Sequence, residues 1–126
     1  MKIGVIGNGV HSKRIQKILI KKKLNFYIYK NNKPNYFDKE KFNRLKECNV
    51  IFLISPNNTH YTYLKELYRG RYIFCEKPPV NNKKDLIKLK KISSKKIYFN
   101  YNFRFNKISK LIMNKKKYKL GELIYA

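Results

Sequence analysis

A glycine-rich turn near the start of the chain has the residue types of a phosphate-binding loop. The turn, Gly7 to Ser12, directly follows the apolar run Ile3 to Ile6 and opens a stretch of helical periodicity. In a dinucleotide fingerprint the first glycine permits a tight turn, the second lets the backbone approach a pyrophosphate, and free N–H groups of the helix bind its charge. We therefore predict that a nicotinamide dinucleotide is bound by Gly7, Asn8, Gly9, Val10, His11 and Ser12.

Two positions of this turn leave alternatives open. Ser12 stands where the fingerprint has a third glycine or an alanine, and its hydroxyl could cap the helix or bind a phosphate. Taken by itself, His11 is expected to be an ordinary turn residue, because no metal ligand or carboxylate lies near it in sequence.

The end of the second predicted strand bears on the choice of cofactor. The fingerprint has an acidic residue there, which binds the ribose 2′-hydroxyl. The chain instead has Lys30, whose charge could accommodate the 2′-phosphate of NADP. The abundance of lysine explains this residue equally well, so the choice between NAD and NADP stays open.

A second candidate site follows the fourth predicted strand. Glu76-Lys77-Pro78 lies at the carboxyl edge of the predicted sheet, where open α/β folds bind their ligands. Pro78 and Pro79 end the strand and restrict Lys77 to an extended conformation. A lysine held there could donate a hydrogen bond to a substrate oxygen or relay its proton during hydride transfer. In isolation, the same tripeptide would be a strand terminator with a solvated lysine.

The elements that position these residues alternate between strand and helix. We predict five strands, at Ile3 to Ile6, Phe26 to Tyr29, Val50 to Ile54, Tyr72 to Cys75 and Ile97 to Tyr101. Apolar residues at helical spacing follow each strand, the last of them in the stretch Phe105 to Met113, and a final apolar run spans Leu123 to Tyr125. This alternation predicts an α/β fold with a Rossmann-type, doubly wound parallel sheet.

Length and composition favour a single cytoplasmic domain. The chain has 126 residues, and none of its apolar runs approaches the ~20 residues of a membrane span, so we expect no membrane association. Its two cysteines, Cys48 and Cys75, lie in apolar segments without the spacing of a zinc or redox site. Structural thiols in a reducing compartment are therefore expected, with no metal.

The formal net charge of +24 would by itself favour a polyanion such as nucleic acid. However, Lys, Asn, Ile and Tyr together make up 67 of the 126 residues, and all four have AT-rich codons. A composition bias of the genome explains the charge equally well. Because the lysines are scattered, specific binding of nucleic acid is not expected.

Read together, four segments resemble the Gfo/Idh/MocA oxidoreductases, named for glucose-fructose oxidoreductase and inositol dehydrogenase. The segments are Gly7 to Gly9, Ser55 to His60, Cys75 to Pro78 and Tyr101 to Phe105. The resemblance implies that Pro56 and Asn57 line the path from adenosine to nicotinamide and that Glu76 lies beside the nicotinamide ribose. It implies that Lys77 is the catalytic lysine facing a sugar-like substrate, with Arg104 nearby. His60 would cap the following helix or lie beside a ribose.

Members of this family are considerably longer and carry a second α/β domain that supplies much of the substrate pocket. We therefore expect residues 1–120 to form the NAD(P)-binding domain and residues 121–126 to be the truncated start of the second domain, with the C-terminal substrate domain absent. The isolated domain would be incomplete as an enzyme, and its last strand could pair with a partner chain or a second copy. The alternatives are a non-enzymatic nucleotide- or partner-binding module and a basic polyanion-binding protein.

Overall fold

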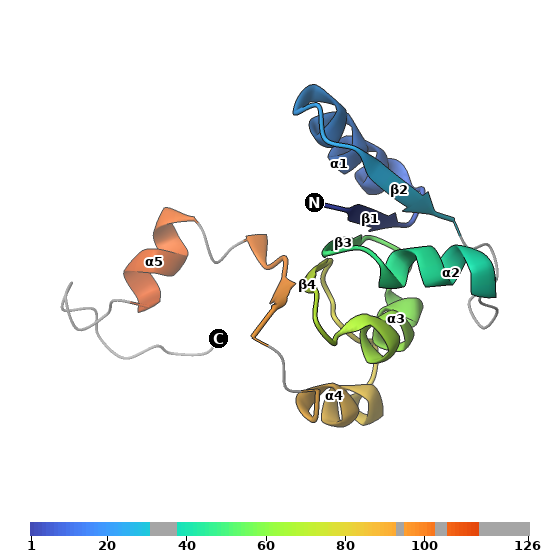
Figure 1. The fold of residues 1–126 in the computed structure, drawn as a ribbon. Helices are drawn as coiled ribbons and strands as arrows, with labels where there is room; N and C mark the ends of the chain where they lie inside the picture. Colours follow the sequence, from blue (N-terminus) through green and yellow to red (C-terminus); the bar gives the residue numbers. More distant parts are fainter. Residues whose placement is uncertain (31–37, 93–94, 103–105, 114–126) are drawn as a thin grey trace.

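The computed structural model of the chain describes residues 1–30, 38–92, 95–102 and 106–113. Its strands form one parallel sheet of five, in the order β2-β1-β3-β4-β5 (Figure 1). The strands are β1 (Ile3–Ile6), β2 (Phe26–Tyr29), β3 (Val50–Leu53), β4 (Tyr72–Cys75) and β5 (Ile97–Phe99). The strand order reverses at β1, which confirms the predicted doubly wound sheet.

Helices cover both faces of this sheet. The helices in the described ranges are α1 (Val10–Lys21), α2 (Lys39–Lys46), α3 (His60–Leu67), α4 (Lys83–Lys90) and α5 (Lys107–Met113), with a 3-10 turn, η1 (Asn57–Thr59), before α3. The first four of them cover the sheet. α1 packs on one face, and α2, α3 and α4 pack on the other (Figure 1). This division follows from the right-handed crossovers between parallel strands. α1 connects β1 to β2 in one direction along the sheet, whereas α2, α3 and α4 each connect their strands in the opposite direction and so lie on the opposite face.

The larger part of the core lies on the face covered by α2, α3 and α4. Every second residue of β3 and β4 is buried there, as the period of two in a strand requires. The strands contribute Ile51, Leu53, Ile73 and Cys75, and the helices contribute Phe42, Leu45, Leu64, Leu67 and Leu89. Both cysteines are unpaired and buried in this core.

The opposite face is only partly covered. Under α1, the side chains of Ile3, Val5 and Leu19 form a small second core. Beyond it, Phe52, Phe74 and Tyr98 form a row across β3, β4 and β5, with ring centroids 5.4 and 5.2 Å apart. Phe74 is 43% exposed and Tyr98 is 47% exposed. We call these three side chains the aromatic row.

Gly7 is indispensable to the turn between β1 and α1. Its φ angle is +117°, in the region that side chains disfavour, and a Cβ built on it would lie 2.3 Å from the carbonyl oxygen of Ile54. Its N–H donates to the carbonyl of Tyr29 at 3.0 Å. The turn therefore touches the ends of both strands beside β1, and no side chain fits between them.

The observed strands are shorter than predicted at two ends. β3 ends at Leu53 and β5 ends at Phe99, although the N–H of Ile54 still donates to the carbonyl of Ile6 at 2.8 Å. Arg104, the final apolar run and the predicted boundary after residue 120 lie outside the described residues.

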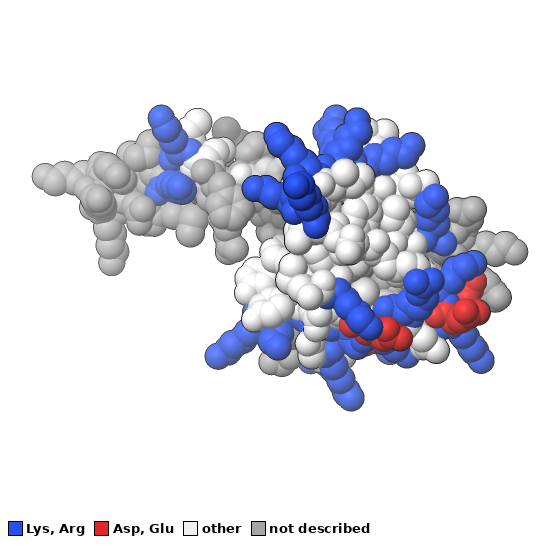
Figure 2. Space-filling view, turned by 45° about the horizontal axis from the view of Figure 1, so that its top comes forward, with Lys and Arg blue, Asp and Glu red and all other residues white. Residues whose placement is uncertain are grey.

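The surface carries basic side chains on many sides. In Figure 2, Lys and Arg surround a central area of other residues and do not gather into one stripe. None of the helices in the described ranges is long and apolar enough to cross a lipid bilayer.

We expect Gly7→Ala to destabilise the protein more than Gly70→Ala does. Both glycines have positive φ, but a Cβ on Gly70 meets nothing within 4 Å. Gly70→Ala should thus cost only the conformational penalty of about 1–2 kcal/mol, whereas Gly7→Ala must also displace a strand-end carbonyl and should cost about 3 kcal/mol or more. Urea unfolding followed by circular dichroism measures both values, and equal losses would contradict the contact with Ile54.

We expect neither thiol to react with a disulfide reagent while the protein is folded. Burial raises the pKa of the Cys75 thiol to about 12 and also raises the pKa of Cys48, and only the thiolate is nucleophilic. Titration with Ellman's reagent should detect no thiol in buffer and both thiols in denaturant. Rapid labelling of either cysteine in buffer would show that the core is open.

Candidate functional site

The surface above the β1-α1 turn has the features of an anion site. A Cβ on Gly9 would meet nothing within 4 Å, so packing within the fold does not require glycine at this position. No side chain caps α1 among the described residues, whereas Asp38 caps α2 and Asn82 caps α4. The first N–H groups of α1 lack intrahelical carbonyl partners, and a negative ligand can supply the missing acceptors.

Ser12 is used inside the turn. Its hydroxyl donates to the carbonyl of Gly7 at 2.8 Å and accepts from the Gln16 side chain at 3.0 Å, and the residue is completely buried. The hydroxyl therefore ties the first turn of α1 to the end of β1. The smallest hydroxyl side chain fits where the fingerprint has glycine or alanine.

His11 and Glu76, which are distant in sequence, form a contact at the carboxyl edge of the sheet. His11 Nε2 lies 2.6 Å from Glu76 Oε1, and the same oxygen accepts from Asn100 Nδ2 at 2.7 Å. The fold thus gives His11 a carboxylate partner, although no carboxylate lies near it in sequence. Asn100 is not among the predicted site residues, and its only signal in the sequence is that it is the next-to-last residue of a predicted strand.

Lys77 follows Glu76 on the same edge. It is exposed, its backbone N–H lies 3.3 Å from Glu76 Oε2, and the Lys77-Pro78 peptide bond is cis. Among the described residues, no carboxylate forms an ion pair with its ammonium group. The ammonium group is thus free to meet a ligand.

His60 is completely buried at the start of α3. Its Nδ1 lies 2.9 Å from the carbonyl oxygen of Pro78, and its Nε2 lies 2.9 Å from that of Ser55. Its ring therefore joins the loop after β3 to the loop after β4. Its side chain neither caps the helix nor reaches the exposed edge.

The remaining predicted residues also lie along the carboxyl edge or in the turn. Lys30 is exposed immediately after β2, and Pro56 and Asn57 are exposed after β3. Asn8 and Val10 are exposed beside Gly9. The fold thus brings the ends of β1, β2, β3 and β4 together, as the sequence predicted.

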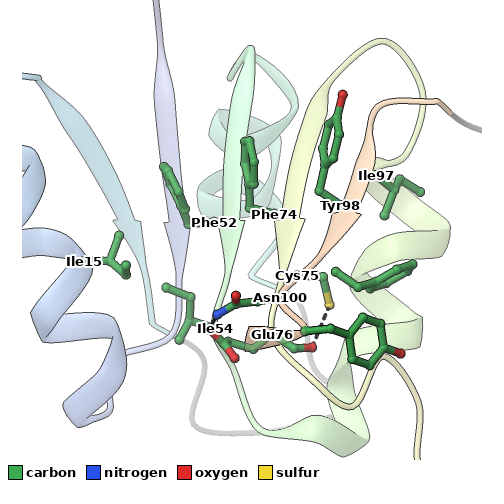
Figure 3. A pocket seen from close by; sticks show the side chains of 11 residues that line it. Ile15, Phe52, Ile54, Phe74, Cys75, Glu76, Ile97, Tyr98 and Asn100 are labelled. Atoms are coloured by element: carbon green, nitrogen blue, oxygen red, sulfur yellow. Dashed lines mark hydrogen bonds between the residues drawn. The ribbon is translucent and has the colours of Figure 1, made fainter. Parts of the chain in front are cut away.

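A cavity of about 500 Å³ adjoins these residues on the partly covered face (Figure 3). Its walls include Ile15 of α1, Ile54 and the aromatic row, and Glu76 and Asn100 lie at its polar end. The space is therefore apolar except where it meets the carboxyl edge. That composition suits a flat ring bearing a polar substituent.

Comparison with solved structures places this fold within longer proteins. A dehydrogenase, MviM, from Clostridium difficile is 26% identical with a TM-score of 0.64, over 90% of this chain and 43% of its own. UDP-N-acetylglucosamine 3-dehydrogenase GnnA from Acidithiobacillus ferrooxidans is 13% identical with a TM-score of 0.59, over 90% and 42%. YPO2259 from Yersinia pestis is 18% identical with a TM-score of 0.63, over 99% and 41%. The chain spans less than half the length of each, and the last two likenesses show the fold alone.

Comparison at the level of sequence families gives a more direct assignment. None of the curated proteins is significantly similar to the chain. Residues 9–101 match the family GFO_IDH_MocA, described as an oxidoreductase family with an NAD-binding Rossmann fold. The match includes every strand from β2 to β5 and most of the candidate site. The chain therefore belongs to the Gfo/Idh/MocA oxidoreductase family, of which it contains the NAD-binding Rossmann domain.

Proposed function

We propose that the chain binds a nicotinamide dinucleotide with its pyrophosphate above Gly9, at the N-terminus of α1. The observation that carries this proposal is that the packing of the fold does not require glycine at position 9. In addition, no side chain among the described residues caps the helix that begins beside it. A pyrophosphate accounts for both features, because it needs close approach to the backbone and supplies acceptors for free N–H groups.

The remaining cofactor contacts follow the carboxyl edge in both directions. On the β2 side, Lys30 would lie beside the adenosine ribose, and on the β3 side Pro56 and Asn57 would line the path to the nicotinamide. Glu76 would lie beside the nicotinamide ribose, at the polar end of the cavity. Family membership supports a nicotinamide dinucleotide in general terms.

For the whole protein, we propose hydride transfer to or from a hydroxyl or carbonyl carbon of a sugar-like substrate. The bound cofactor supplies or accepts the hydride. Lys77 would donate a hydrogen bond from Nζ to the substrate oxygen or relay its proton during hydride transfer, because the residue is exposed directly after Glu76 at the carboxyl edge of the sheet. Arg104 would be a second substrate contact. One structural neighbour is a UDP-N-acetylglucosamine 3-dehydrogenase, and its sugar substrate agrees with this proposal.

We expect Gly9→Asp to abolish saturable binding of NADH. The new side chain would occupy the open space above the turn, and its carboxylate would repel the pyrophosphate. The measurement is titration of cofactor fluorescence at moderate salt, with thermal unfolding as the check that the variant is folded. Asn43→Asp, on the exposed side of α2, adds the same charge elsewhere and should leave binding intact. NADH binding that survives Gly9→Asp would exclude this site.

We expect the protein to bind both NADH and NADPH. We expect Lys30→Asp to raise the dissociation constant of NADPH by about tenfold relative to that of NADH. A carboxylate at the end of β2 would repel the 2′-phosphate of NADPH and could accept from the 2′-hydroxyl of NADH. The ratio of the two dissociation constants measures the effect. Lys65→Asp, on exposed α3 surface, is the control for total charge. An unchanged ratio would show that Lys30 does not face the adenosine ribose.

A further inference from the structure

The two oxygens of the Glu76 carboxylate have different surroundings. Oε1 has two close contacts, at 2.6 Å from His11 Nε2 and at 2.7 Å from Asn100 Nδ2. Among the described residues, Oε2 has only one, longer contact, 3.3 Å from the backbone N of Lys77. The side chain is 20% exposed, so a ligand can reach it.

The chemistry of these groups assigns the donors. A carboxylate only accepts hydrogen bonds, so Nε2 of His11 carries the hydrogen that it donates to Oε1. With two strong donors on Oε1, the orientation of the carboxylate is set and the remaining capacity lies on Oε2. A ligand that binds Oε2 must therefore bring a donor. A neutral hydroxyl meets this need, whereas a phosphate would be repelled.

His11 also lies between a region that favours an anion and a region that disfavours one. It lies in the first turn of α1, whose N–H groups favour an anion, and it contacts the carboxylate that an anion would avoid. Its N–H on Oε1 reduces the repulsion between that carboxylate and a phosphate at the helix. A molecule with a pyrophosphate followed by a sugar diol matches this order of groups along the edge.

We propose that His11 and Asn100 are positioning residues that orient Glu76 so that its Oε2 accepts from a hydroxyl of the ribose on the nicotinamide side of the cofactor. This inference rests on the proposed dinucleotide site. It assigns the two donors to the recognition of one ribose, separately from the recognition of the pyrophosphate.

ADP-ribose and ADP test the inference, because both carry the pyrophosphate and only ADP-ribose carries the second ribose. Calorimetric titration of the full chain with each ligand gives two dissociation constants. We expect His11→Leu and Asn100→Leu each to raise the dissociation constant of ADP-ribose by about tenfold and to change that of ADP by less than about twofold. His11→Gln keeps an N–H donor and should restore most of the loss. Asn43→Leu removes an exposed amide on α2 and should change neither constant.

Three outcomes would overturn the inference alone, and a fourth would overturn the proposed function with it. If His11→Leu weakens the binding of ADP-ribose and of ADP equally, His11 acts on the pyrophosphate directly. If neither dissociation constant changes, His11 and Asn100 do not position Glu76 for binding. If the unaltered chain binds ADP but prefers ADP-ribose no more than ADP, Glu76 does not bind the second ribose, although the pyrophosphate site stands. If it binds neither ligand, the proposed function itself fails.

Discussion

The carbonyl oxygen of Ile54 occupies the space that a side chain at residue 7 would need, and this contact joins the ends of β1 and β3. The N–H of Gly7 joins β1 to β2 in the same way, through the carbonyl of Tyr29. Because three strand ends meet at one residue, backbone contacts determine where α1 begins, and the bond from the buried Ser12 hydroxyl to the carbonyl of Gly7 secures its first turn. The free N–H groups of the helix therefore point to the same place whatever surface residues surround them.

Buried polar groups hold the rest of the carboxyl edge. The two ring nitrogens of His60 each lie 2.9 Å from a carbonyl oxygen, that of Ser55 and that of Pro78. The Thr59 hydroxyl donates its one hydrogen to the carbonyl of Pro56 and therefore accepts from the Ser55 hydroxyl. These loops would otherwise leave backbone carbonyls unsatisfied beside the core, which is costly. The exposed residues on the loops, Asn57 and Lys77, thus project from a backbone that is held from beneath. Such support is what a site needs to keep its groups in place before a ligand arrives.

Much of the fold could be predicted because its signals are local. The first residue of every strand agrees with the sequence analysis, since each strand is an apolar run that begins abruptly, whereas Ile54 and Tyr101 lie just beyond strand ends that depend on hydrogen bonds to other segments. The glycine-rich turn and the place of Lys77 could also be predicted, because each depends on a short segment of the sequence. The partner of His11 could not be predicted, because it is 65 residues away and meets the histidine only through the register of β1, β3 and β4. The burial of His60 was missed for the same reason.

The aromatic row leaves Phe74 and Tyr98 partly exposed on a molecule whose formal charge is +24. In dilute buffer, mutual repulsion keeps such molecules apart, although burying the rings would be favourable. At physiological ionic strength the screening length falls to about 8 Å, and the repulsion between neighbouring molecules weakens while the apolar attraction does not. Added salt therefore has two opposite effects on this protein. It releases non-specifically bound polyanions, and it brings the protein closer to the limit of its own solubility.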